Sequence, residues 1–250
     1  MVSKPKRNIK KDERSKVTLK KLTFHKLSWL EYITIGLSIL FWFYPHPYNV
    51  IFSVLLAMPI IGLIINGLYG RPSISTLVAI SKGEKGEDKY DVADFIDFSA
   101  WVILIRVLKD FEFESFYSMI IPGTITFLSV LVLLFFTHSK IEQSDKNKAW
   151  IYFSLIGNLF IYSYAVTYGA NCVYDNSEPK VYSAKVVDKR KHHSRKAGTT
   201  YYLKVTPWGH HYDKEEITVT SDQYEETPIG SSVKIDLKEG LFNIPWYYIE

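Results

Sequence analysis

The sequence lacks the features that mark disulfide-stabilised, glycosylated and nucleotide-binding proteins. It has one cysteine, Cys172, so no disulfide can form within the chain, and it has no Asn-x-Ser/Thr acceptor. Neither a G-x-G-x-x-G stretch nor a Walker A motif occurs, which excludes the common phosphate-binding loops. No small-residue cleavage site follows the first apolar run, and the basic segment before that run is too long for a signal peptide.

Positive charge and aromatic residues are both present in an informative pattern. The formal net charge is only +4, yet residues 1–26 hold about ten Lys and Arg against two acids, Asp12 and Glu13. Because this basic segment directly precedes an apolar run, it predicts a cytoplasmic N-terminal segment of a membrane protein rather than a nucleic-acid-binding arm. Aromatic residues make up 16% of the chain, which suits the interfaces of a membrane.

Four runs are long and apolar enough to cross a bilayer, at about 27–44, 48–70, 116–137 and 149–171. A crossing helix needs roughly 17–25 residues, and each run carries Trp or Tyr near at least one end. The sequence therefore predicts an α-helical membrane bundle with four transmembrane helices within residues 27–171. Gly62, Gly67 and Gly157 are expected to permit close approach of these helices.

A fifth segment, about 95–113, is ambiguous. Asp97 precedes its short apolar core and Arg106 lies within it. A crossing would hold Arg106 near mid-depth, at a cost of about 2.5–3.5 kcal/mol on insertion scales. An interfacial or re-entrant helix avoids that cost and is the preferred prediction, with a fifth crossing as the alternative. The stretch before it is predicted to be a polar loop with a helical start at Pro72.

The number of crossings sets the predicted topology. With four crossings, the N-terminal segment, the 71–115 loop and the C-terminal domain all face the cytoplasm. Residues 138–148 then face outward although they contain three lysines, which weighs against this arrangement. The expected location is the bacterial cytoplasmic (inner) membrane, with the chain as a multi-pass protein.

Residues 172–250 change to the period-two pattern of β-strands. Strands are expected in KVYSAKVVDK, TTYYLKVTPW, EITVTS, SSVKIDL and IPWYYIE, with one helical turn in DQYEETPIG capped by Ser221 or Asp222. Five short strands favour a small all-β domain, an OB or SH3-like barrel. The last strand is predicted to close this barrel against the first, with Trp246 over its core. The alternative is that these final aromatic residues press on the membrane or the helical bundle.

The stretches NCVYDNSEPKVYSAKVVDKR, TTYYLKVTPWG and EITVTSDQYEETPIGSSVKIDLKEGLFNIPWY, with RPSISTLVAIS and RVLKDFEF, resemble an uncharacterised group of bacterial multi-pass membrane proteins. Proteins of that group pair a short helical bundle with a C-terminal β-barrel-like module. The resemblance covers most of residues 70–250. It implies this architecture and supplies no catalytic residues.

Two sets of residues are candidates for functional contacts. Asn66 and Asn158 are polar residues within predicted membrane helices, where they form interhelical hydrogen bonds or line a transport path. The basic hairpin is predicted to contact anionic lipid head groups through Lys189, Arg190, Lys191, Arg195 and Lys196. Nucleic acid is not expected as a partner, because residues 171–250 are close to neutral.

The remaining chemical groups give no catalytic prediction. The pairs His192-His193 and His210-His211 are expected at opposite ends of a hairpin, so neither a shared metal site nor a cofactor is predicted. Cys172 reads as a packed thiol. The sequence thus predicts a non-enzymatic, membrane-anchored interaction or scaffold module. Its partners would be the lipid bilayer and an unidentified protein or a second copy; the alternative is a subunit of a transport or channel-like assembly.

Overall fold

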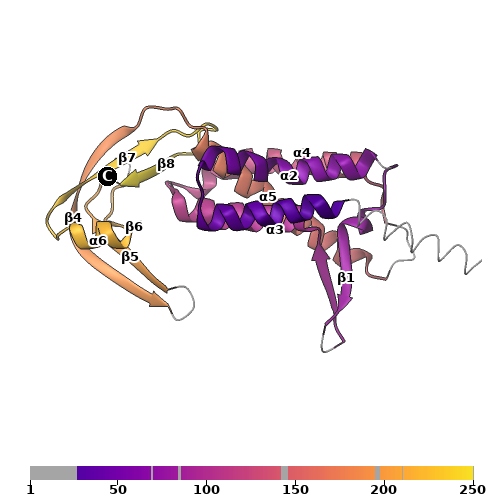
Figure 1. The fold of residues 1–250 in the computed structure, drawn as a ribbon. Coiled ribbons are helices and arrows are strands. Elements are labelled where there is room, and N and C mark those ends of the chain that lie inside the picture. Colours follow the sequence, from indigo (N-terminus) through magenta and orange to yellow (C-terminus); the bar gives the residue numbers. More distant parts are fainter. Residues whose placement is uncertain are drawn as a thin grey trace, which may run out of the picture. The chain divides into compact units, whose positions relative to one another are not determined.

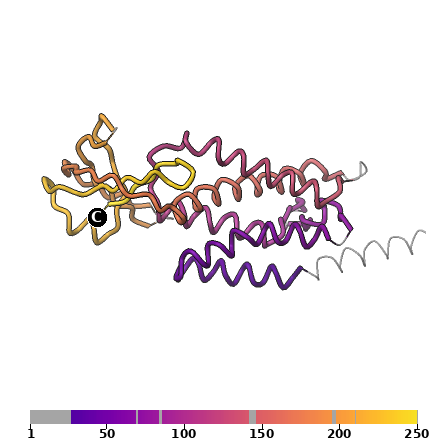
Figure 2. Tube along the Cα trace, turned by 90° about the horizontal axis from the view of Figure 1, so that it is seen from above, coloured from indigo at the N-terminus to yellow at the C-terminus, as the bar shows by residue number. Residues whose placement is uncertain are grey.

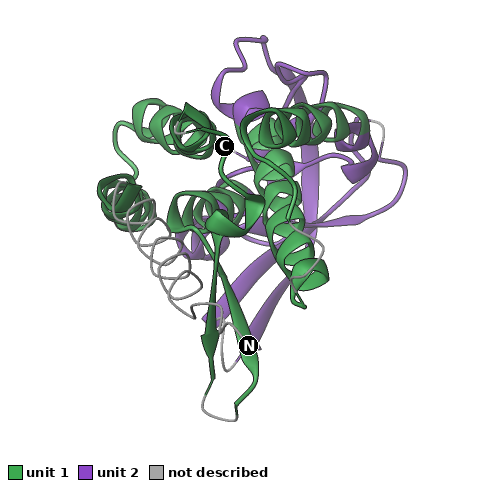
Figure 3. Cartoon of the chain, turned by 90° about the vertical axis from the view of Figure 1, so that its right-hand side faces the viewer, with its two compact units in different colours: residues 1–107, 121–169 green, residues 108–120, 170–250 purple. Residues whose placement is uncertain are grey.

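The computed structural model describes residues 27–68, 70–83, 86–141, 146–194, 198–209 and 211–249. Within these, the chain forms two compact units (Figure 3). Unit 1 comprises residues up to 107 together with 121–169, and unit 2 comprises residues 108–120 and 170–250. The short segment 108–120, which sequence reasoning assigned to the helical region, thus belongs to the β unit.

Unit 1 is built from helices that lie side by side (Figures 1 and 2). The first helix is Leu27–Phe43, followed by α2 (Tyr48–Leu68), α3 (Asp94–Asp110), α4 (Ile120–Thr137, preceded by the 3-10 turn Phe116–Met119) and α5 (Lys148–Val173). Three helical stretches in the described residues are long and apolar enough to cross a membrane: α2, Phe116–Thr137 and α5. The first helix has only 17 described residues, so three such helices stand where the sequence predicts four.

Close contacts fix the directions of these helices. Near the carboxyl ends of α2 and α4, a methyl group at Gly67 would lie 2.6 Å from Cβ of Thr137, so these two helices run parallel. Near the start of α2, Phe52 packs on Gly169 close to the end of α5, so α5 runs the opposite way. The predicted role of glycine is confirmed at Gly62, which faces the Phe95 ring, and at Gly67. It is wrong at Gly157, where an added methyl group would meet nothing.

Helix α3 lies within the bundle and runs antiparallel to α2. Its start is fixed by Phe95 against Gly62, and its end by Val107, whose side chain packs against Gly169 beside Phe52. One face of α3 is buried. Its opposite face exposes Phe98, Trp101 and Ile105 at helical spacing. Helix α3 thus packs against the neighbouring helices, and both the interfacial or re-entrant helix and the alternative of a fifth crossing stay predictions.

Between α2 and α3 the chain forms a β-hairpin where the sequence predicts a polar loop. A 3-10 turn, Ile74–Leu77, leads into β1 (Val78–Lys82), which pairs antiparallel with β2 (Asp88–Val92). Only the base of the hairpin is buried, at Val78 and Val92. The exposed part carries charged side chains and little apolar alternation, and so gives no strand signal in the sequence.

Unit 2 is an antiparallel six-stranded sheet that forms a nearly closed barrel. Its strands are β3 (Glu112–Phe113), β4 (Lys180–Ser194), β5 (Gly198–Val205), β6 (Glu215–Val219), β7 (Ser232–Lys238) and β8 (Trp246–Ile249), in the order β3-β8-β7-β4-β5-β6. Strand β4 pairs with β7 through its first part and with β5 through its second, with an irregularity between Val186 and Asp188. Such a break lets one long strand turn a barrel corner. The outermost strands approach one another where the Thr218 hydroxyl donates to the Glu112 carboxylate.

The predicted strands of the β domain are present, with two corrections. The final strand β8 pairs with β7 and with β3, not with the first strand β4. Two-residue β3 is too short to leave a pattern in the sequence. The helix α6 (Ser221–Glu226) is capped by Thr220 in a reciprocal capping box with Gln223, not by Ser221 or Asp222. The barrel core is formed by buried apolar residues that include Val186, Leu203, Val205, Ile217, Ile235 and Tyr247.

Candidate functional site

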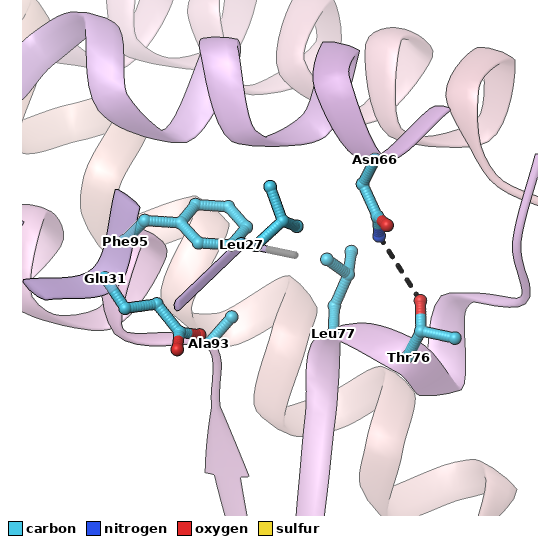
Figure 4. Close-up of a pocket in the computed structure, with 7 residues that line it drawn as sticks. All are labelled: Leu27, Glu31, Asn66, Thr76, Leu77, Ala93 and Phe95. Carbon is cyan, nitrogen blue, oxygen red and sulfur yellow. Dashed lines mark hydrogen bonds between the residues drawn. The ribbon is translucent and has the colours of Figure 1, made fainter. Parts of the chain in front are cut away.

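In unit 1, buried polar side chains gather around Asn66, near the carboxyl end of α2. The Asn66 Nδ2 donates to Thr76 Oγ1 at 3.3 Å (Figure 4) and to His138 Nε2 at 2.9 Å. The other ring nitrogen, Nδ1, lies 2.8 Å from Thr137 Oγ1. Because Nε2 accepts, the ring is neutral with its proton on Nδ1. Burial lowers the pKa of His138 to about 4, which keeps this state at neutral pH.

Backbone hydrogen bonds place two connecting segments at this same end of unit 1. Ile74 N donates to Ser139 O at 3.0 Å, and Ser139 N donates to Pro72 O at 2.9 Å. The predicted topology put residues 71–115 and 138–148 on opposite sides of a membrane. Since a hydrogen bond cannot reach across some 30 Å of hydrocarbon, this part of the prediction is wrong if the helices span a membrane.

A cavity of about 10 Å³ adjoins Asn66. Its lining, drawn in Figure 4, is Leu27, Glu31, Asn66, Thr76, Leu77, Ala93 and Phe95. The Asn66 Oδ1 is buried and has no hydrogen-bond partner among the described residues. The cavity matches one water molecule, which could donate to this oxygen. It is too small for an organic substrate.

Asn158, the second predicted intramembrane contact, lies near the middle of α5. Its Nδ2 donates to Ser154 O at 3.1 Å, one turn back in the same helix. Within the described part of the chain, no hydrogen bond joins it to Asn66. Asn66 thus bonds to residues in the connecting segments, Thr76 and His138, whereas Asn158 bonds within its own helix; the interhelical intramembrane contact stays a prediction for both. Threonines contribute links of this kind instead: Thr167 donates to Thr126 at 2.8 Å between α5 and α4.

The three described residues of the basic hairpin all have partners inside unit 2. Lys189 donates to the carbonyl groups of Tyr224 and Thr227. Arg190 lies 3.1 Å from Glu216, and Lys191 lies 2.8 Å from Glu225. Lys189 and Lys191 thereby link β4 to α6. The other predicted lipid contacts, Arg195 and Lys196, lie outside the described residues. Contact of the hairpin with lipid stays a prediction.

The histidines do not form a common site in the described chain. His192 pairs with Thr200, as the hairpin predicts, and His193 Nδ1 lies 2.9 Å from Thr199 Oγ1. His210 lies outside the described residues. No group of three or more His, Cys, Asp or Glu side chains that could hold a metal occurs among the residues that the structure describes. Cys172 is buried, in agreement with a packed thiol.

A polar cluster that the sequence did not indicate joins the outer strands of the barrel; we term it the seam. His211 stacks on Trp208 with ring centroids 4.4 Å apart, and its Nδ1 lies 3.2 Å from Glu215. Its Nε2 lies 3.8 Å from Glu114, which follows β3. Burial raises the pKa of Glu112, and the nearby Glu215 charge raises it further, while the bond from Thr218 opposes both. Glu112 and Glu114 lie about a hundred positions from His211 in sequence, so spacing could not reveal the seam.

A second polar cluster in unit 2 lies at the carboxyl end of α5, where Asn171 holds the loop between β7 and β8. Asn171 Nδ2 donates to Ile244 O at 2.8 Å, and Asn171 Oδ1 accepts from Phe242 N at 2.9 Å. The main-chain oxygen of Asn171 accepts from Leu241 N at 3.1 Å. Asn171 is fully buried. These three hydrogen bonds hold the backbone of the loop in one position against Asn171. The composition of the loop alone does not predict that its conformation is fixed.

Asp175 continues this cluster toward the final strand. Its Oδ2 accepts from Gly240 N at 3.1 Å and from Trp246 Nε1 at 2.9 Å, and its Oδ1 accepts from Ser177 N at 2.7 Å. Burial alone would raise the pKa of Asp175, but the bonds from Ser177 and Trp246 and the charge of Lys238 hold it below its usual value. Asp175 is therefore ionised and structural. Trp246 is buried, and its ring nitrogen is satisfied, but it does not belong to the barrel core as predicted; Trp208 and Tyr247 are the large aromatic residues of that core.

Comparison with family models, with curated proteins and with solved structures gave no match for this chain. The resemblance to bacterial multi-pass membrane proteins accordingly stays a prediction. What the chain does is argued below from the geometry of its two units.

Proposed function

We propose that this chain is an integral protein of the bacterial cytoplasmic membrane that carries a β-barrel as a non-enzymatic interaction module. The observation that carries the membrane assignment is the outer face of unit 1. Large apolar side chains are exposed on α3, α4 and α5, including Trp101, Val132, Phe136 and Phe153. In water such an apolar surface would promote aggregation, whereas it is the expected outer surface of a protein in a lipid bilayer.

Five crossings fit the helix directions better than four. Helices α2 and α4 run parallel, so the chain must return along the bundle between them, and α3 makes that return. A 17-residue helix is about 25 Å long, near the lower limit for a crossing. Arg106 lies four residues before the end of α3 rather than at mid-depth, so its long side chain can reach the interface.

The distribution of basic residues supports the same topology. The Asn66 end of the bundle receives the segment 138–148 with its three lysines, on the same side as the basic N-terminal segment. At the other end the short connections are PHP and residues 111–115, which contain Glu112 and Glu114 and no Lys or Arg. With the basic side cytoplasmic, the barrel lies on the opposite side of the membrane. This proposal replaces the predicted cytoplasmic barrel.

The fixed attachment of the loop to α5 supports an interaction role. Asn171 and Asp175 bind the 240–246 segment to the end of a membrane helix, so that loop keeps a constant position against it. The barrel exposes Tyr212 and Ile229 to a partner, which we propose to be another protein or a second copy.

Photo-crosslinking in living cells tests the interaction role. A photoreactive residue at Tyr212 should give a discrete protein adduct that is resistant to alkaline extraction from membranes. The same residue at Lys140, on the opposite connecting segment, is the matched control and should not give that adduct. Discrete adducts from neither Tyr212 nor Ile229, in cells that contain the protein, would contradict the interaction role.

Transport is the second candidate, and the unpaired Asn66 Oδ1 beside a cavity lined by Glu31 favours it. Asn66→Leu and Asn158→Leu variants in liposomes test it through proton flux. Loss of flux in Asn66→Leu with the fold retained would support transport. No flux in the unaltered protein would exclude a proton path.

A further inference from the structure

The loop between β7 and β8 combines a rigid backbone with exposed apolar side chains. Leu241 and Phe242 are 49% and 43% exposed, although their backbone N–H groups are both bonded to Asn171. Gly240 adopts φ +78°, and a methyl group there would lie 2.4 Å from the Asn171 side-chain amide. The loop thus requires glycine at this corner and holds its apolar tip in one conformation.

The position of the tip along the chain is set by the helix that it grips. Asn171 lies in the last turn of α5, which ends at Val173. Since α5 is a proposed membrane span, its last turn lies at the boundary between hydrocarbon and head groups. Because the backbone of the tip is hydrogen-bonded directly to that turn, the tip lies at the same depth in the bilayer as the turn. This depth does not depend on the rest of the barrel.

The segment that leads into α4 also carries exposed aromatic residues near this loop. Glu114 N donates to Pro245 O at 3.2 Å, so the chain enters α4 from a point beside the same loop. Phe116 and Tyr117, in the 3-10 turn that precedes α4, are both strongly exposed. Aromatic residues at this depth are the usual interface anchors of membrane proteins.

We propose that the β7–β8 loop inserts Leu241 and Phe242 into the interfacial layer of the bilayer that α5 spans. This inference rests on the proposed membrane integration of unit 1 and adds a lipid contact made by unit 2. The occupant of this apolar tip is lipid, because the tip is fixed to the membrane-exit turn of a spanning helix. The loop thereby acts as a second anchor that holds the start of β8 close to the membrane.

An environment-sensitive dye at single cysteines tests the insertion. In a Cys172→Ser background, Leu241→Cys is labelled with a nitrobenzoxadiazole group, and the full chain is placed in phosphatidylcholine–phosphatidylglycerol vesicles. We expect blue-shifted emission that lipids with a nitroxide near the head group quench strongly. The matched control is Ser232→Cys, which is exposed at the other end of β7 and has no part in the proposed partner surface. Because the seven residues of β7 span about 23 Å, Ser232 lies far from the tip, and we expect water-like emission without quenching there.

A third label separates the failure of this inference from that of membrane integration. Val132→Cys on α4 should be quenched by lipids with a nitroxide deep in the acyl chain. If Val132 is quenched and Leu241 is not, the loop does not insert, although unit 1 does. Blue-shifted emission at Leu241 without quenching would mean that protein covers the tip, which also overturns the inference. If Val132 is not quenched, membrane integration itself fails, and the loop proposal with it.

Discussion

At the scale of single residues, Asn171 is the side chain whose loss should matter most in unit 2. Asn171→Ala removes the partners of Ile244 O and Phe242 N, and a buried polar group left without a partner costs about 1–3 kcal/mol. We expect the urea midpoint of unit 2 in detergent to fall clearly. The exposed Asn176→Ala is the matched control and should leave the midpoint unchanged. Equal midpoints for both variants would show that the Asn171 bonds do not stabilise the loop.

Glu112 should make the stability of the barrel depend on pH. Burial raises its pKa above the ordinary 4.5 in the folded state, so the folded state holds the proton more tightly than the unfolded chain. Its contribution to stability is full below about pH 4.5 and is lost as pH rises through the folded pKa. Urea midpoints measured from pH 4 to 8 should therefore fall less in Glu112→Gln than in the unaltered protein. A parallel fall in both proteins would contradict this account, and the exposed Glu178→Gln serves as control.

Residue-level prediction from the sequence identified Asn66 but not its surroundings. A polar residue within an apolar run can be recognised from the sequence alone, so Asn66 and Asn158 could be predicted as candidate contacts. His138 lies 72 positions from Asn66, and only the packing of α2 beside α4 brings them to 2.9 Å. The basic residues of β4 were visible too, while their acidic partners on β6 and α6 depend on strand register.

At the scale of elements, helix packing should distinguish two glycines of the bundle. A methyl group at Gly62 would lie 2.3 Å from the Phe95 ring, whereas one at Gly157 meets nothing within 4 Å. Gly62→Ala should destabilise unit 1 by about 1–3 kcal/mol through overpacking of α2 against α3. Gly157→Ala should be neutral or gain up to about 1 kcal/mol from helix propensity. Thermal unfolding in detergent measures both, and a stable Gly62→Ala protein would refute the contact between α2 and α3.

The final strand should be required for the barrel. Deleting residues 243–250 removes β8 together with the buried side chains of Ile244, Trp246 and Tyr247, and it leaves β3 and β7 without their common neighbour. We expect unit 2 to become sensitive to limited proteolysis while the helices stay in the membrane. Removal of Glu250 alone is the control. A truncated barrel as resistant as the control would show that β8 is dispensable.

Elements with a strong period were predictable, and short or exposed ones were not. The strands β4, β5, β6 and β7 follow from alternation and β-branched residues, and the long helices follow from apolar length. Strand β3 has two residues, and the β1–β2 hairpin is mostly exposed. Neither therefore has the alternating apolar pattern by which a strand is predicted from sequence. One of the two strands that pair with β8 is β3, which lies between α3 and α4 in the sequence. No local sequence pattern predicts this pairing.

At the scale of the whole molecule, the membrane topology determines on which side of the membrane the barrel is proposed to lie. The three lysines in residues 138–148 already weighed against an outward-facing segment, but the sequence could not show that residues 72–74 pair with Ser139. That pairing places both connecting segments at one end of unit 1. In the proposed topology, α3 is therefore a crossing segment, and the barrel is proposed to lie on the other side of the membrane from the N-terminal segment.

The most direct test is thiol labelling of intact cells with a membrane-impermeant reagent. In a Cys172→Ser background, one variant carries Ser194→Cys on the barrel hairpin, and the other carries Lys140→Cys at the Asn66 end of the bundle. Five crossings with a cytoplasmic N-terminal segment predict that residue 194 is labelled in intact cells and that residue 140 is protected until lysis. If both residues were labelled, or both protected until lysis, they would lie on the same side of the membrane, and the five-crossing account would be contradicted.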